Sequence, residues 1–276
     1  MTSSGKSSTS WVAISTFGVP LAIRTSGPAL MTSVRRILPP DNVPIDLGVT
    51  LTEFALDHDK TGMFHVSQDD RPLARAAELA TAIGSLDAHI RLFIASNAPG
   101  HVFIHAGAVT HRGLGLLLPG PSLAGKTELV ACLVKIGATY YSDEYAVLDP
   151  NGLLHPYPKP LSIRTRDRRE STDVDVGRLG GRRGTRPVPV AIIATTHYDA
   201  TAAWRPEPRS KAAGVMILLA HSGLARRDPA RALRSIHRAV EHAQIFDGPR
   251  GEAEPAARAL LAGIEAWEGP RPTLAP

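Results

Sequence analysis

Eight residues near the middle of the chain have the types and the spacing of a phosphate-binding loop: Gly120-Pro121-Ser122-Leu123-Ala124-Gly125-Lys126-Thr127. They fit the pattern G-x-x-x-x-G-K-[ST], in which consecutive backbone N–H groups and the positive end of a helix dipole surround a polyphosphate. In such a loop Lys126 reaches the β- and γ-phosphates, and the Thr127 hydroxyl binds Mg²⁺. The alternative is a glycine-rich turn that only caps a helix. The pattern favours binding of a nucleoside triphosphate.

The segments on either side of this loop have the patterns of a strand and a helix, which phosphate binding by such a loop requires. Residues 113–118 are apolar and rich in leucine, which predicts a buried strand that leads into the loop. Residues 126–135 carry apolar side chains at helical spacing, and Gly137 is typical of a helix end. A strand, a glycine-rich loop and a helix start in this order form the context in which the motif binds phosphate.

Further groups that could do chemistry flank the loop. His105 lies among apolar residues of a predicted strand at 101–109, and Asp143-Glu144 follow a predicted strand at 138–142. A carboxylate at the carboxyl end of a strand beside a phosphate loop commonly holds Mg²⁺. The expected metal ligands are therefore Thr127, Asp143 and Glu144. The alternatives are a hydrogen-bonded core histidine and an acidic pair in a solvated turn.

Composition limits the class of protein. Of 276 residues 43% are hydrophobic, which is enough for a large core, and Cys132 is the single cysteine. Disulfides and a cysteine-based metal site are thereby excluded, and a reducing, cytoplasmic location is expected. The moderately apolar stretch 11–23 contains Gly18 and Pro20 and lacks a signal peptide's features, and no apolar run approaches membrane-span length.

The positive charge is concentrated in one segment. The formal net charge is +5, and residues 164–186 contain eight arginines against four acidic residues, a net charge of +4. This segment has no aromatic residue, so it lacks the stacking side chains of a nucleic-acid-binding surface. It has no apolar periodicity either, and we predict a mobile basic loop.

His105, the loop at 120–127 and the acidic pair Asp143-Glu144 together resemble the catalytic domain of the HPr kinase/phosphorylase family. That family is related in fold to phosphoenolpyruvate carboxykinase. The resemblance is best over residues 100–165, and it implies an α/β P-loop kinase-type core, ATP and Mg²⁺ as cofactors, and phosphoryl transfer to a serine hydroxyl of a protein or peptide. By position, His105 matches the family's active-site histidine, Lys126 its loop lysine, Thr127 its Mg²⁺-binding hydroxyl, and Glu144 its proton acceptor.

The sequence departs from the family at two positions, and the family's glycine-rich substrate-binding segment has no clear match, with the arginine-rich segment near that place. The family has two adjacent aspartates where this chain has Asp143-Glu144, so which carboxylate acts as the base stays open. The family also has a Mg²⁺-binding glutamate before an Ile-Arg pair, and Ser162 stands there instead. Two rival functions remain: a kinase for a small molecule or a biosynthetic peptide, and a nucleotide-binding regulator without transfer. The hydroxyl-bearing acceptor and the oligomeric state, a homo-oligomer included, stay open.

The expected organisation has three parts. Residues 1–40 are predicted to be poorly ordered, 41–99 to form a small α+β lobe, and 100–276 to form the P-loop kinase-like catalytic domain. Within the lobe we expect two short strands, at 49–55 and 62–66, and a helix at 71–94. After the basic loop we expect a strand at 188–194, an apolar run of undetermined type at 214–220, and helices at 228–242 and 252–267.

Overall fold

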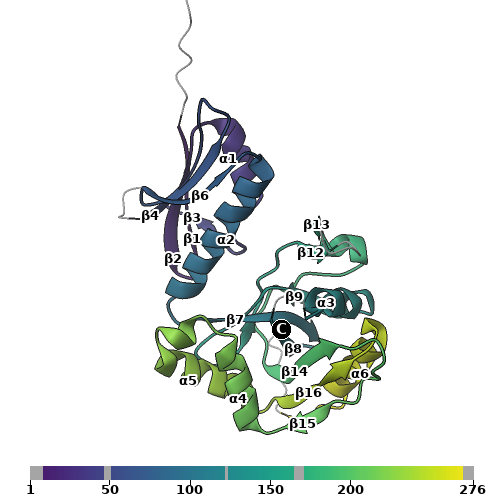
Figure 1. The fold of residues 1–276 in the computed structure, drawn as a ribbon. Helices are drawn as coiled ribbons and strands as arrows, with labels where there is room; N and C mark the ends of the chain where they lie inside the picture. The colour runs from purple at the N-terminus through teal and green to yellow at the C-terminus, as the bar shows by residue number, and fades with distance from the viewer. Residues whose placement is uncertain (1–8, 47–50, 122–123, 165–170, 270–276) are drawn as a thin grey trace, which may run out of the picture. The chain divides into compact units, whose positions relative to one another are not determined.

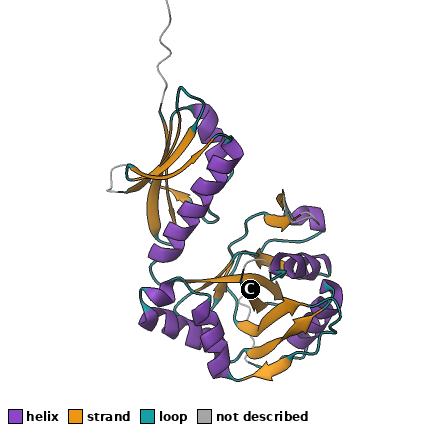
Figure 2. Ribbon diagram, in the orientation of Figure 1, coloured by secondary structure: helices purple, strands orange, loops and turns teal. Residues whose placement is uncertain are grey.

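The computed structural model describes residues 9–46, 51–121, 124–164 and 171–269, and the chain divides into two compact units, 1–99 and 100–276. Both units contain helices and strands, which makes the protein a mixed α/β chain (Figure 1; Figure 2). Within the described ranges, no helix is both long and apolar enough to cross a membrane.

The N-terminal unit is a six-stranded sheet with two helices. Its strand order is β3-β1-β2-β4-β5-β6. Helix α2 packs on β4, β5 and β6 through Leu86, Ile90 and Ile94, which recur every four residues and are almost completely buried. The elements are β1 (Ser10–Thr16), β2 (Val19–Thr25), α1 (Pro28–Arg35), β3 (Val43–Pro44), β4 (Thr52–His58), β5 (Phe64–Gln68), β6 (Arg71–Ala76) and α2 (Leu79–Asn97).

The structure corrects the prediction that residues 1–40 are poorly ordered. Strands β1 and β2 form a hairpin whose two loop residues, Phe17 and Gly18, have φ values of 47° and 74°. Two consecutive positive φ angles are typical of the turn that matches the twist of a hairpin. Along β2 the alternate residues Val19, Leu21 and Ile23 are buried, which is the period of two of a strand, in a sequence otherwise rich in Ser, Thr and Gly. Residues 1–8 lie outside the described ranges.

The predicted helix over residues 71–94 is wrong in its first part. Residues Arg71–Ala76 form β6, which pairs antiparallel with β5, and the helix begins at Leu79. Asp69 and Asp70 have φ values of 47° and 61°, so they form the turn of the hairpin between β5 and β6. Pro72 is compatible with β6 because β6 is the edge strand of the sheet.

The C-terminal unit is built on an eight-stranded mixed sheet with the order β11-β10-β7-β8-β14-β16-β15, in which β9 also pairs with β7. Strands β8, β14 and β16 are parallel to one another, and β7 is antiparallel to β8. The strands are β7 (Val102–His111), β8 (Leu114–Pro119), β9 (Thr139–Ser142), β10 (Tyr145–Leu148), β11 (Leu154–His155), β14 (Val190–Tyr198), β15 (Glu207–Arg209) and β16 (Gln244–Arg250). The helices are α3 (Lys126–Lys135), α4 (Lys211–Ala220), α5 (Pro229–Val240), α6 (Ala253–Glu265) and the short 3₁₀ helix η2 (Leu224–Arg226).

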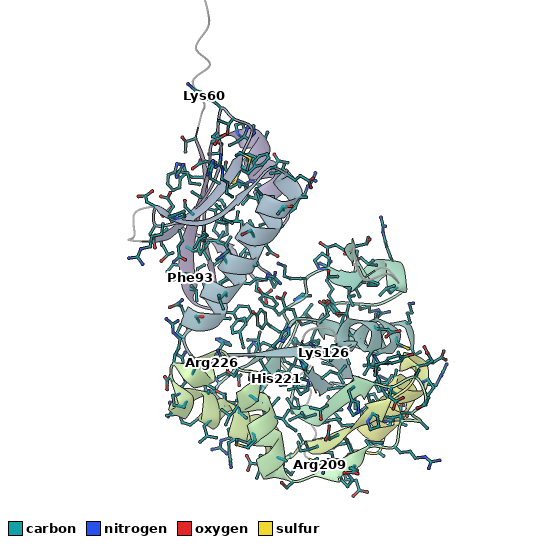
Figure 3. The ribbon with its side chains drawn as sticks, in the orientation of Figure 1. Lys60, Phe93, Lys126, Arg209, His221 and Arg226 are labelled. Carbon is teal, nitrogen blue, oxygen red and sulfur yellow. The ribbon has the colours of Figure 1, made fainter. Side chains whose placement is uncertain are left out.

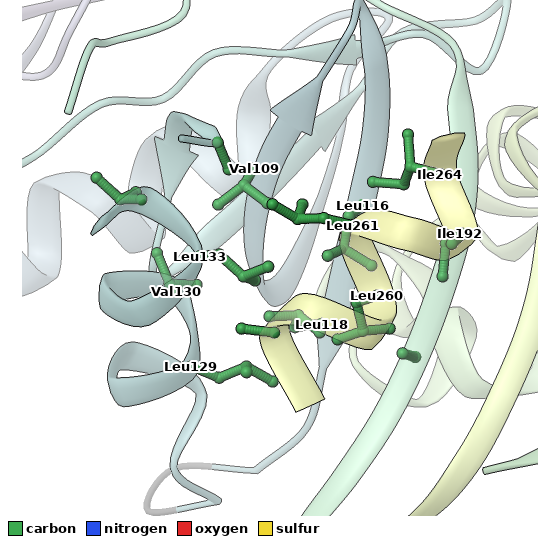
Figure 4. Packing of buried hydrophobic residues seen from close by; sticks show 14 of the residues in the cluster. Val109, Leu116, Leu118, Leu129, Val130, Leu133, Ile192, Leu260, Leu261 and Ile264 are labelled. Carbon is green, nitrogen blue, oxygen red and sulfur yellow. The ribbon is translucent and has the colours of Figure 1, made fainter. Parts of the chain in front are cut away.

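Helices cover both faces of this sheet. Leu116 and Leu118 of β8 point toward α3 and α6, where they meet Leu129 and Leu260 (Figure 4). The intervening Leu117 belongs to a second buried cluster that includes residues of α4 and α5. This alternation produces three layers, and it explains why the strand is a continuous apolar run. The strand prediction for 113–118 is confirmed.

The segment 164–186 is more ordered than predicted where the structure describes it. It contains β13 (Ser171–Val174), paired with β12 (Leu161–Arg164), and the 3₁₀ helix η1 (Val176–Leu179). The backbone at Arg182 and Gly184 bonds to Tyr140 of β9, which ties this part to the sheet. Val176 of η1 is completely buried in the core beside α3, and Leu179 packs against that core, so one short apolar turn and backbone bonds together hold the segment. Residues 165–170 lie outside the described ranges.

The other expected elements of the C-terminal unit are found with small shifts. The apolar run at 214–220 belongs to α4, whose N-cap Ser210 accepts a hydrogen bond from the N–H of Ala213. Asp228 caps α5 in the same way, with Pro229 in the first turn, as the sequence predicts. Helix α6 covers most of the range predicted for the last helix.

Candidate active site

The phosphate loop lies between β8 and α3. Strand β8 ends at Pro119, and α3 begins at Lys126 with Gly125 as its N-cap residue. Gly125 has a φ of 77°, a left-handed conformation that favours glycine. The start of α3 thus has the backbone N–H groups and the positive dipole end of a helix N-terminus, a feature that favours anions. The middle of the loop, Ser122 and Leu123, lies outside the described residues.

Lys126 is buried at the base of this loop, with only 7% of its surface exposed. Its Nζ donates hydrogen bonds to the carbonyl oxygens of Gly120 and Pro121, each at 2.7 Å. Burial lowers the pKa of Lys126 to about 8, although the charge of Asp143 acts in the opposite direction. The side chain therefore stays mostly protonated at neutral pH, and its two bonds to carbonyl oxygens fix it against the loop.

Asp143 is fixed by three hydrogen-bond donors from three different elements. Its Oδ2 accepts bonds from the Thr127 hydroxyl and from the backbone N–H of Ser162, both at 3.3 Å. Its Oδ1 accepts a bond of 2.9 Å from the hydroxyl of Tyr140. Burial nevertheless raises the pKa of Asp143 above its ordinary value, so desolvation outweighs the three bonds. The structure thus brings Thr127 and Asp143 together at the start of α3.

His105 lies beside the start of the loop because of the sheet register. The paired residues of β7 and β8 end at Ala106 and Pro119, so His105 and Gly120 are the next residues on the two strands. The N–H of His105 donates a 2.8 Å bond to the carbonyl of His221, at the end of α4. Burial lowers the pKa of His105 to about 4, with smaller contributions from the charges of Lys126 and His221. The imidazole is therefore neutral at neutral pH.

Glu144 occupies the turn between β9 and β10. Both strands run antiparallel to β7, and the backbone carbonyl of Glu144 accepts a 3.1 Å bond from the N–H of Ala106. The hydroxyl of Ser142 accepts bonds from the N–H groups of Glu144 and Tyr145, at 3.1 and 2.9 Å. These bonds place the Glu144 backbone next to Asp143 and one residue from His105 on the neighbouring strand.

The donor set at Thr127 and Asp143 fits Mg²⁺ when a phosphate supplies further ligands. Mg²⁺ prefers oxygen ligands in octahedral geometry, and adjacent ligands at its usual bond length lie about 3 Å apart. The Thr127 hydroxyl and Asp143 Oδ2 are 3.3 Å apart. Within the described part of the chain, no group of three or more His, Cys, Asp or Glu side chains is placed to hold a metal ion. Such a magnesium site therefore depends on phosphate oxygens and water, as is usual in phosphoryl-transfer enzymes.

The sequence analysis missed three residues around this site. Tyr140 is completely buried, and its hydroxyl donates a hydrogen bond to Asp143. In the sequence, only its position three residues before the carboxylate indicated this contact. His221, which follows an apolar helix with no motif, lies close to Lys126 (Figure 3), and burial and the Lys126 charge lower its pKa. The Arg250 guanidinium donates a hydrogen bond to the carbonyl of Gly125. In the sequence, its position between the end of a strand and a glycine was the indication of such a role.

Two arginines of the basic segment 164–186 have partners within the fold. The guanidinium of Arg183 pairs with Asp175, and the carbonyl of Arg182 bonds to the backbone of β9. Ser162 contributes to the site through its backbone N–H, although a glutamate was expected from the family pattern. Three further arginines of the segment, Arg166, Arg168 and Arg169, lie outside the described residues.

Comparisons with known proteins add a distant structural similarity. No family model matches the sequence, and no curated protein matches it. Among solved structures, the chain is similar to the HPr(Ser) kinase/phosphatase from Coxiella burnetii, with a TM-score of 0.36 and 16% sequence identity. The similarity covers 59% of this chain and 95% of that protein's chain. At this level of similarity the functional argument depends on the site residues of this chain.

Proposed function

We propose that this chain is an ATP-dependent kinase that transfers the γ-phosphoryl group to a serine hydroxyl of a protein or peptide. The observation that carries the proposal is the contact between the Thr127 hydroxyl and Asp143 Oδ2, at 3.3 Å, at the start of α3 and beside the buried Lys126. A lysine, a hydroxyl and a carboxylate at a helix N-terminus are the parts that hold a nucleoside triphosphate in kinases of the P-loop class.

Nucleotide binding requires compensation of the triphosphate charge. The Lys126 ammonium, which bonds to two loop carbonyls, can donate to the β- and γ-phosphates after a small rearrangement of its side chain. Thr127 and Asp143 would hold Mg²⁺, which supplies charge neutralisation at the phosphoryl group when it is bound. Tyr140 and the backbone of Ser162 keep the Asp143 carboxylate oriented toward Thr127.

The transfer step uses the acidic pair and His105. The acceptor oxygen forms a bond to the γ-phosphorus while the bond from that phosphorus to the bridging oxygen breaks, and ADP leaves with the bonding electrons. The acceptor proton passes to a carboxylate, which we assign to Glu144 because Asp143 Oδ2 lies against the Thr127 hydroxyl, where Asp143 would hold Mg²⁺. His105 is neutral at neutral pH, so its role is to orient a hydrogen bond and not to supply a positive charge.

The direct test is phosphoryl transfer with labelled ATP to a panel of serine-containing proteins, peptides and small alcohols, read by mass spectrometry. The expected result is a product one phosphoryl group heavier, formed by the parent protein and not by the Lys126→Ala variant. If ATP is bound in a Lys126-dependent manner and no acceptor in a broad panel consumes it, the kinase assignment loses its support.

One observation favours a second candidate, a nucleotide-binding regulator without transfer. Ser162 stands where the family that this chain resembles has a metal-binding carboxylate, and its backbone N–H donates a bond to Asp143. A regulator would bind Mg-ATP with no acceptor-dependent ADP release. A kinase for a small molecule would instead modify an alcohol in the panel and leave the proteins and peptides unmodified.

A further inference from the structure

A fully buried arginine, Arg250, lies under the phosphate loop. It is the last residue of β16, where it pairs with Tyr198 of the parallel strand β14. The carboxyl ends of β14 and β16 lie at the same edge of the sheet as the end of β8, from which the loop starts. Arg250 has 0% of its surface exposed, and its Cζ lies 5.8 Å from the centroid of the Tyr198 ring.

Arg250 joins the loop to the strand edge through backbone carbonyls. Its Nη2 donates a 3.0 Å bond to the carbonyl of Gly125, and its Nη1 donates a 2.8 Å bond to the carbonyl of Gly251. The Gly125 carbonyl also accepts the first helical bond of α3, from the N–H of Leu129 at 3.1 Å. One guanidinium therefore holds the residue that both ends the loop and begins the helix.

The contact also restricts the residue type at position 125. A Cβ atom on Gly125 would lie 2.4 Å from Nη2 of Arg250, which is far inside the contact distance of two atoms. Gly125 therefore has two reasons to be glycine, its left-handed φ and the close approach of the guanidinium.

The charge of Arg250 is poorly compensated by the protein. Its acidic contact is with Glu128, at 3.4 Å, and the Glu128 side chain is 62% exposed to solvent. In the described part of the chain, Nε of Arg250 has no hydrogen-bond acceptor. A buried cation is costly without a close anion, and the positive end of the α3 dipole adds to the cost. Lys126 places a second buried cation in the same loop.

We propose that Arg250 is a positioning residue of the phosphate site, which fixes Gly125 at the start of α3 and adds a buried positive charge that a bound polyphosphate compensates. This inference rests on the proposed nucleotide binding and deepens it. The arginine acts through Gly125 and through its charge, so a lysine, which keeps the charge but cannot bridge two carbonyls in the same planar geometry, replaces it only in part.

The test compares Arg250→Lys and Arg250→Gln with the parent by isothermal titration with Mg-ATP and Mg-ADP. We expect Arg250→Gln to weaken Mg-ATP binding at least about 10-fold, which is about 1.4 kcal/mol, and to weaken Mg-ADP binding less, because ADP carries less charge. Arg250→Lys should lie between the two. The matched control is Arg258→Gln, which removes an arginine that is 66% exposed and paired with Glu254. Its affinity for Mg-ATP should equal that of the parent.

A second measurement tests positioning without any ligand. Amide hydrogen exchange at Leu129 should be faster in Arg250→Lys than in the parent, whereas exchange at the other end of α3 should be unchanged. Equal Leu129 exchange and equal nucleotide affinities in the parent and both variants would overturn the inference. If the parent does not bind Mg-ATP, the proposed function fails, and the exchange experiment still decides whether Arg250 fixes Gly125. If Arg250→Gln does not fold, Arg250→Lys decides both measurements.

Discussion

Two aspartates, one in each unit, accept several hydrogen bonds and yet have pKa values displaced in opposite directions. Asp59 accepts bonds from the hydroxyl and the N–H of Thr61, from the N–H of Met63 and from His65, between 2.6 and 3.0 Å. These bonds, that of the Thr61 hydroxyl above all, hold its pKa well below the ordinary value. Burial raises the pKa of Asp143 in spite of its three bonds. Hydrogen bonds stabilise the charged form of the first carboxylate within a turn, whereas burial disfavours the charged form of the second.

Two cationic side chains, one in each unit, also have pKa values displaced in opposite directions. In the N-terminal unit Arg24 pairs with Glu53 at 2.7 Å and with Asp57 at 3.0 Å, and the bond to Glu53 above all raises its pKa. In the C-terminal unit Lys126 bonds to carbonyls, and burial lowers its pKa to about 8. Charges that neutralise each other support a fold, whereas a buried cation bonded to carbonyls is typical of a ligand site.

The largest effect should come from Lys126→Ala. Removing this ammonium takes away the charge that stabilises the transferring phosphoryl group, so transfer should fall about 10³-fold and Mg-ATP binding should weaken. The matched control is Lys135→Ala, which changes an exposed lysine at the other end of α3. Transfer kinetics and calorimetry measure both effects. Unchanged values for Lys126→Ala would show that the loop does not bind phosphate.

Glu144→Gln should separate binding from chemistry. The substitution keeps the shape of the side chain and removes its capacity to take the acceptor proton, so kcat should fall about 100-fold while Mg-ATP affinity stays close to that of the parent. Asp143→Asn should instead weaken the dependence of activity on Mg²⁺. Small and identical effects of the two variants on both quantities would assign the pair to a solvated turn.

Tyr140→Phe should have an intermediate effect. It removes one hydroxyl from a completely buried ring and leaves Asp143 with two donors, so about 10-fold should be lost in kcat or in Mg²⁺ affinity. The matched control is Tyr145→Phe, which changes a neighbouring tyrosine of β10. Kinetics at several Mg²⁺ concentrations measure the effect. A loss of folding stability with normal Mg²⁺ dependence would make Tyr140 a structural residue only.

The two aspartates should respond oppositely to neutralisation in the absence of Mg²⁺. The pKa of Asp59 is lowered on folding, so the stabilisation from its charge is complete above the ordinary pKa of 3.8 and is lost as pH falls through the folded-state value. Asp59→Asn should lower Tm at neutral pH. The pKa of Asp143 is raised on folding, so its ionisation opposes folding as pH rises above the ordinary value of 3.8. Asp143→Asn should keep or raise Tm at pH 7, and thermal unfolding at several pH values measures both.

The smallest effect is expected from the basic segment. Replacing Arg166, Arg168, Arg169, Arg182 and Arg183 by Ser should raise the acceptor KM a few-fold, with a salt dependence in the parent protein. Because Arg183 already pairs with Asp175, Arg183→Ser alone should change acceptor KM less than the triple replacement at 166, 168 and 169. Acceptor kinetics that are identical across ionic strengths would leave the segment without a role in recognition.

The sequence predicted the strand, the loop and the helix of the phosphate site because that motif combines local glycine chemistry with apolar periodicity. The sequence also predicted that His105 and Asp143 lie near the loop, because both residues are close to it along the chain. Arg250 is 125 residues from Gly125, and His221 is also remote in sequence. No local pattern predicts such contacts. The parallel pairing of β14 with β8 and with β16 brings Arg250 to the loop, and backbone pairing of the end of α4 with β7 places His221.

The N-terminal unit was harder to predict for a different reason. Its hairpins depend on Phe17, Asp69 and Asp70 at positive φ, where the sequence has no Asn-Gly or Asp-Gly pair to indicate a turn. The apolar residues from Leu73 onward have helical spacing, and the strand pairing of Arg71–Ala76 overrides it.

The measurement that tests the central claim most directly is the gain in ATP affinity on adding Mg²⁺, determined by isothermal titration for the parent, Asp143→Asn and Asp59→Asn. It requires no knowledge of the acceptor. If Thr127 and Asp143 hold Mg²⁺ beside the phosphate loop, the parent and Asp59→Asn bind ATP more tightly with Mg²⁺, and Asp143→Asn loses most of that gain. An equal Mg²⁺ gain in all three proteins, or no ATP binding by the parent, would contradict the account.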